Sequence, residues 1–105
     1  MKEIDSVIDV PIKDRIEQYF RSKVLNEANL EGGFNNRLFK ISLENGMDLL
    51  LKQYFDDERN RLNREYRAFE YLKKLGEMHI PTPLFRDDKD KFAVYSYFPN
   101  LKPPA

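Results

Sequence analysis

The stretch LFKISLENGMDLLLKQYF, residues 38–55, contains two runs of strand-forming residues joined by Glu44-Asn45-Gly46. Asn-Gly between two such runs is a strong local signal for a β-hairpin, because both residues readily adopt the backbone angles of a tight turn. We therefore expect two antiparallel strands here. The preceding run, residues 24–30, predicts a third strand of the same sheet.

The second strand of this hairpin carries a lysine among apolar residues. Side chains on a strand point alternately to its two faces, so Leu50, Lys52 and Tyr54 share one face. A lysine is seldom buried without a partner, because removing an unpaired ammonium group from water costs several kcal/mol. The pattern predicts that Lys52 needs an anion.

Residues 57–75 form the clearest element, a charged helix with apolar positions every three or four residues. Gly76 is the expected C-terminal stop, and Asp56 or Asp57 is the expected N-cap. The length and the defined ends of this segment predict a single long helix.

Glu65 interrupts the apolar face of that helix. It lies between Leu62 and Phe69 at spacings of three and four residues, which places it on the same face. A salt bridge to Lys52 would satisfy both charges and would fix the ammonium group for contact with phosphate oxygens. Alternatively, Lys52 reaches solvent at a strand edge and Glu65 is a charge at the rim. Alternation alone leaves both interpretations open.

Two more strands and a leading helix complete the expected fold. Pro11 suits the first turn of a short amphipathic helix within residues 1–23. After the long helix, IPTPLF (80–85) contains two prolines that exclude a helix, and KFAVYSYF (91–98) is rich in β-branched and aromatic residues. The predicted fold class is α+β: a five-stranded antiparallel sheet, one long helix between its third and fourth strands, and a short N-terminal helix.

A glycine-containing loop precedes the hairpin. It reads EGGFNNR and contains Gly32, Gly33, Phe34, Asn35 and Asn36. Adjacent glycines allow a tight turn close to a ligand, and the exposed amides of such a turn can bind an anion. The motif is neither the dinucleotide fingerprint nor a P-loop, and a Gly-Gly pair is also common in simple turns.

Composition excludes several classes of partner. Lysine plus arginine equals aspartate plus glutamate, at 18 residues each, so no excess charge would attract nucleic acid or an anionic membrane. The absence of cysteine excludes disulfides and thiolate metal sites. The first residues lack the uninterrupted apolar run of a signal peptide. We expect a cytoplasmic protein with neither nucleic acid nor a membrane as its partner.

No metal site and no catalytic residue is expected in this chain. Asp87, Asp88 and Asp90 alternate with basic residues, which is typical of a polar hairpin turn and not of a site for a hard cation. His79 is the only histidine and lies in a predicted loop, where a structural or solvated role is the common one.

The order of these elements resembles the ATP-binding lobe of kinases, in which a strand lysine pairs with a helix glutamate over the phosphates. In detail, the chain resembles the aminoglycoside phosphotransferase and choline kinase-like family. Asn36 matches the asparagine of that family's nucleotide loop, Lys52 matches its phosphate-contacting lysine, and Arg64-Glu65 matches its helix pair. The resemblance covers residues 24–100.

The same resemblance assigns the inter-lobe hinge to AVYSYFPN. It implies that Tyr95 lies next to the adenine pocket, that the backbones of Ser96 and Phe98 bind the adenine edge, and that the Tyr97 side chain points away from it. Where the family hinge often ends in glycine, this chain has Asn100.

By this resemblance the chain has a leading helix (1–23), a nucleotide-binding N-lobe (24–100) and a truncated inter-lobe linker (101–105). It implies an ATP-binding lobe of a kinase that phosphorylates a hydroxyl of a small molecule such as an aminoglycoside or choline. The catalytic aspartate, the Mg²⁺ ligands and the acceptor site would belong to a missing C-terminal lobe, so the isolated chain is expected to be inactive.

One alternative function belongs to a different class. Tyr95, Tyr97 and Phe98 beside Pro99 form an aromatic cluster of the kind that is enriched at interfaces. The chain could then be a small α+β protein-interaction module that uses an exposed strand from Tyr95 to Phe98.

Overall fold

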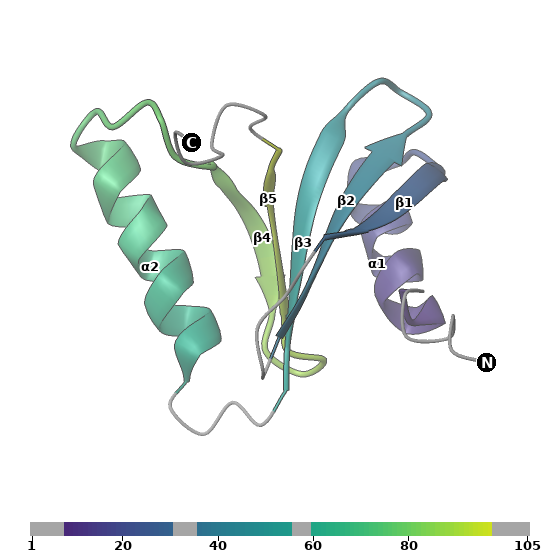
Figure 1. Ribbon diagram of the computed structural model, residues 1–105, viewed down its shortest axis with the longest axis horizontal. Coiled ribbons are helices and arrows are strands. Elements are labelled where there is room, and N and C mark those ends of the chain that lie inside the picture. Colours follow the sequence, from purple (N-terminus) through teal and green to yellow (C-terminus); the bar gives the residue numbers. More distant parts are fainter. Residues whose placement is uncertain (1–7, 31–35, 56–59, 98–105) are drawn as a thin grey trace.

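A computed structural model describes residues 8–30, 36–55 and 60–97, and Figure 1 shows the arrangement of the elements. The expected α+β fold is confirmed: five antiparallel strands form one sheet in the order β1-β2-β3-β5-β4, and the long helix α2 lies between β3 and β4 in the chain. The elements are α1 (Val10–Phe20), β1 (Val24–Leu30), β2 (Asn36–Leu43), β3 (Asp48–Tyr54), α2 (Arg61–Lys74), β4 (Pro83–Asp87) and β5 (Phe92–Ser96). The predicted division into residues 1–23, 24–100 and 101–105 stays a prediction.

The β2–β3 hairpin forms where the sequence predicts it. Gly46 has φ +94°, a value that side-chain-bearing residues rarely adopt, and its N–H donates to the Leu43 carbonyl at 3.0 Å. The Asn45 side chain accepts a hydrogen bond from the Met47 N–H at 2.9 Å. These turn contacts set the register that aligns Leu38 on β2 with Lys52 on β3.

Helix α1 covers one face of the sheet and α2 lies on the other face (Figure 1). Ile12 and Ile16 of α1 are buried because their four-residue spacing places them on the helix face that meets the sheet. Pro11 lies in the first turn, as expected. The cluster on this side also contains the buried residues Ile8, Phe39, Ile41, Leu43, Leu49, Leu51, Phe92 and Val94.

Helix α2 begins later than the sequence predicts. Its N-cap is Asn60, whose φ of +56° is incompatible with helix continuation, so α2 starts at Arg61 and not near residue 57. The expected caps, Asp56 and Asp57, lie outside the described residues. The predicted end is confirmed, since Gly76 has φ +93° and its N–H donates to the Lys73 carbonyl at 3.0 Å.

Strand β5 lies inside the sheet, between β3 and β4. The turn before it is polar, as expected: one Asp87 carboxylate oxygen accepts the N–H groups of Lys89 and Asp90 at 2.8 and 2.9 Å. Tyr95 on β5 is only 1% exposed. The expected exposure of Tyr95 in the alternative interaction strand is therefore wrong, because both edges of β5 are paired within the sheet. Tyr97 is half-buried, and Phe98 lies outside the described residues.

Neither described helix combines the length and the apolar composition that crossing a bilayer requires.

Candidate functional site

The charged pair predicted from the sequence is present. Lys52 Nζ donates to Glu65 Oε1 at 2.9 Å, joining β3 to α2. The pair does not lie deep in the core: the Lys52 side chain is 22% exposed and the Glu65 side chain is 38% exposed. Both charges thus remain accessible to a ligand, and the alternative of two separate surface charges is wrong.

Glu65 owes its position to the apolar contacts of α2. Leu62 is fully buried and Tyr66 is nearly so, and both pack with Tyr54, Ala93 and Tyr95 in a cluster on this face of the sheet. Glu65 follows Leu62 by three residues and precedes Phe69 by four, so all three lie on the helix face that meets the sheet.

Tyr54 is a site residue that the sequence analysis missed. Its hydroxyl donates to the same Glu65 Oε1 at 2.5 Å, and Lys52 Nζ lies 5.2 Å from its ring centroid. The signal that could have identified it is the strand alternation that places Tyr54 and Lys52 on one face. A phenol at that position can both bury its ring and bind the carboxylate.

A cavity of about 410 Å³ opens beside the ion pair. Its walls are mostly apolar, and Lys52 and Glu65 supply its charged groups. The lining residues are Leu38, Leu50, Lys52, Glu65, Phe69, Ile80, Pro81 and Tyr95. Apolar walls together with a cationic side chain suit a ligand that has an apolar ring and an anionic group.

The predicted hinge is placed only in part. Tyr95 lines the cavity, as expected. The backbone N–H of Ser96 donates to the Thr82 carbonyl at 2.9 Å, so this amide is already used within the sheet. Tyr97 is not among the residues that line the cavity, and its ring lies 4.8 Å from Lys40 Nζ. Phe98 lies outside the described residues.

The glycine loop also lies largely outside the described residues: Gly32, Gly33, Phe34 and Asn35 all do. Asn36 is described as the first residue of β2, and its Cα pairs with that of Tyr54 at the end of β3. Asn36 thus lies opposite Tyr54, two residues along β3 from Lys52.

Burial controls the phenols of this site. It raises the pKa of Tyr54 well above its ordinary value, and the hydrogen bond to Glu65 raises that pKa further. Burial also raises the pKa of Tyr95. Both side chains therefore keep their protons to a higher pH than an exposed tyrosine, and the Tyr54 hydroxyl acts as a hydrogen-bond donor to Glu65.

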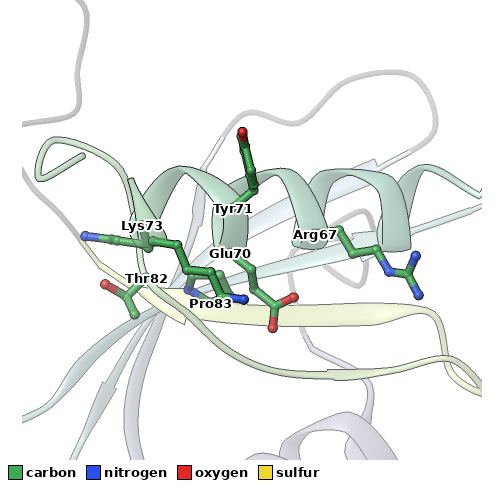
Figure 2. A pocket seen from close by; sticks show the side chains of 7 residues that line it. Arg67, Glu70, Tyr71, Lys73, Thr82 and Pro83 are labelled. Carbon is green, nitrogen blue, oxygen red and sulfur yellow. The ribbon is translucent and has the colours of Figure 1, made fainter. Parts of the chain in front are cut away.

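A second hollow of about 380 Å³ is lined by residues of α2 together with Thr82 and Pro83, and Figure 2 shows these side chains. Tyr71 and Glu70 point to opposite sides here, and the side chains carry both signs of charge (Figure 2). None of the predicted site residues lines this hollow. Across residues 8–30, 36–55 and 60–97, no group of three histidine or acidic side chains is arranged to hold a metal ion.

Comparisons with known proteins identify the fold. No protein-family model matches the sequence, and no curated protein matches it either. Among solved structures, the chain is similar to a putative fructosamine-3-kinase from Thermobifida fusca YX-ER1, with a TM-score of 0.64 and 19% sequence identity. The match covers 90% of this chain and 33% of that protein, so the chain spans about a third of its length. The chain thus has a kinase-like fold.

Proposed function

We propose that this chain is the ATP-binding N-terminal lobe of a phosphotransferase that phosphorylates a hydroxyl of a small molecule. The observation that supports this most directly is the Lys52–Glu65 ion pair at the side of an apolar cavity, within a kinase-like fold. Such a pair is what phosphoryl transfer requires of this lobe, because a fixed ammonium group neutralises charge on the phosphates.

In this proposal Lys52 binds the α- and β-phosphates, and Glu65 orients Lys52. The adenine ring occupies the apolar part of the cavity between Leu50 and Tyr95. Because the Ser96 N–H is already bonded to Thr82, the group that Ser96 offers the adenine edge is its carbonyl oxygen. The backbone amides of residues 33–36 and of Phe98 would complete the nucleotide site.

The chemistry of transfer would need further groups. The described residues do not fit a magnesium site. The Mg²⁺ ligands would belong to a C-terminal lobe, together with the catalytic aspartate. That lobe would also select the acceptor. Aminoglycosides, choline and sugar derivatives are the classes that the family resemblance and the neighbour's name suggest. The chain alone would bind the nucleotide without turnover.

A titration of this chain with ATP, followed by backbone amide NMR, tests the proposal. We expect shifts at Lys52, Ser96 and residues 33–36. Lys52→Ala should weaken binding about 10-fold or more, because a hydrogen bond to a charged group contributes about 1.5–3 kcal/mol.

Lys89→Ala is the matched control, since Lys89 is an exposed lysine in the β4–β5 turn and should leave the affinity unchanged. Amide spectra of both variants verify that the fold is retained. Unchanged spectra of the unmodified chain at millimolar ATP would contradict the proposal.

A further inference from the structure

Tyr54 is more deeply buried than either member of the ion pair. It is 3% exposed at the end of β3, and its N–H donates to the Lys91 carbonyl at 2.8 Å. On the other side its backbone pairs with Asn36 of β2. A buried aromatic ring between two hydrogen-bonded neighbours has few alternative rotamers.

The two side chains of the ion pair are less restrained than Tyr54. The Glu65 side chain is 38% exposed and the Lys52 side chain is 22% exposed. A lysine–glutamate pair with this exposure contributes little, because water competes for both charges and two long side chains must be ordered. Something else must hold Glu65 if Lys52 is to be fixed for a ligand.

Tyr54 contacts both partners at once. Its hydroxyl donates to Glu65 Oε1 at 2.5 Å, and this oxygen also accepts from Lys52 Nζ at 2.9 Å. Lys52 Nζ lies 5.2 Å from the centroid of the Tyr54 ring, within the range of a cation–π contact. The two-residue spacing on β3 makes this possible, because Tyr54 and Lys52 leave the strand on the same face.

We infer that Tyr54 is a positioning residue: its buried hydroxyl holds the Glu65 carboxylate on Lys52, so that α2 and β3 present one fixed ammonium group to the phosphates of a nucleotide. The consequence for the nucleotide rests on the proposed function. The positioning itself is a property of this chain and can be measured without a ligand.

The first experiment observes the Lys52 ammonium group by ¹⁵N NMR in the unmodified chain and in Tyr54→Phe, which removes only the hydroxyl. An ammonium held on a carboxylate exchanges its protons slowly, so we expect a Lys52 signal that Tyr54→Phe broadens beyond detection. Tyr66→Phe is the matched control, because Tyr66 is buried in the same cluster and does not line the cavity. The Lys52 signal should persist in Tyr66→Phe.

The hydroxyl proton of Tyr54 can be observed in the unmodified chain, so this test does not depend on whether Tyr54→Phe folds. In the unmodified chain the Tyr54 hydroxyl proton should give a slowly exchanging downfield resonance, as expected for a short hydrogen bond to a carboxylate. Glu65→Gln should move this resonance upfield. Absence of the resonance, or of a protected Lys52 signal, in the unmodified chain would overturn the inference.

The second experiment is a double-mutant cycle for ADP affinity with Tyr54→Phe and Glu65→Gln. Tyr54→Phe should weaken ADP about 3- to 10-fold, the range of one intramolecular hydrogen bond. If Tyr54 acts through Glu65, adding Tyr54→Phe to Glu65→Gln should cost little more. Effects that simply multiply would show independent roles and would overturn the inference.

The two experiments separate the two claims. If ADP fails to bind the unmodified chain but Tyr54→Phe still removes the Lys52 signal, the proposed function fails and the positioning role stands. If ADP binds and the Lys52 signal is the same in both chains, the positioning role fails and the proposed function stands.

Discussion

Residues on the cavity side of the sheet differ sharply in solvent exposure. Lys52 and Glu65 remain partly exposed, whereas Tyr54 and Tyr95 are nearly inaccessible. The charges are therefore available for a ligand while the phenols are held neutral by burial. This division also determines how stability should depend on pH.

The buried phenols predict a loss of stability at alkaline pH. Burial raises the pKa of Tyr54 and Tyr95 above the ordinary value of 10.0, so above pH 10 the unfolded chain releases phenolic protons that the folded chain retains. Their contribution is fully present below pH 10 and is lost as the pH rises towards the folded pKa values, by about 1.4 kcal/mol per pH unit for each phenol.

Urea unfolding of the unmodified chain and of Tyr54→Phe, between about pH 9 and pH 11, measures this contribution. The fall of the free energy of unfolding with pH should be less steep in Tyr54→Phe by one phenol's share, since the variant lacks one of the phenols whose pKa is raised while Tyr66 and Tyr95 remain. Curves that run parallel above pH 10 would contradict the prediction.

Among the elements, α2 connects stability to the site. Leu62 and Tyr66 bury one side of this helix against the sheet, and the same side carries Glu65. The ends of α2 are defined by Asn60 and Gly76, whose positive φ angles stop the helix in both directions. The packing of α2 and its two ends thus position Glu65, in addition to the ion pair with Lys52.

Leu62→Ala should lower the free energy of unfolding by about 2–5 kcal/mol, because Leu62 is fully buried and its truncation leaves a cavity under α2. Tyr71→Ala is the control on the same helix. Tyr71 is 63% exposed, so its loss should change stability by no more than about 0.5 kcal/mol. Chemical denaturation measures both, and equal losses would contradict the packing of α2 described above.

The whole molecule consists of one sheet with a separate apolar cluster on each face. The α1 face is sealed by isoleucines and carries none of the site residues, whereas the α2 face carries the cavity and the ion pair. The α1 face therefore serves stability, and the α2 face combines stability with the site.

Ile12→Val tests this separation. Ile12 is 2% exposed in the α1 cluster, so removal of one methyl group should cost about 0.5–1.5 kcal/mol. The ATP affinity should stay within about 2-fold of the unmodified chain, since distant sites without shared partners act independently. Thermal unfolding and the ATP titration together give the result, and a large loss of affinity would mean that the two faces are coupled.

Much of the fold follows from local patterns. Asn45-Gly46 predicts the hairpin because few residues accept its backbone angles, and Gly76 marks the end of α2 for the same reason. Alternation and helical spacing made Lys52 and Glu65 candidate partners but left two separate surface charges equally open, and the structure shows that they pair. The start of α2 was missed because Asn60 adopts a left-handed conformation that spacing does not reveal.

Features that depend on which strands become neighbours appear only in three dimensions. The insertion of β5 between β3 and β4 buries Tyr95, which only the interaction-module hypothesis took as exposed. The contact of Tyr54 with Glu65 depends on where α2 crosses the end of β3, and Lys52 and Tyr54 then share one carboxylate oxygen. Local sequence specifies the conformation and the face of each residue, but distances between elements come from packing over long chain separations, which no short pattern encodes.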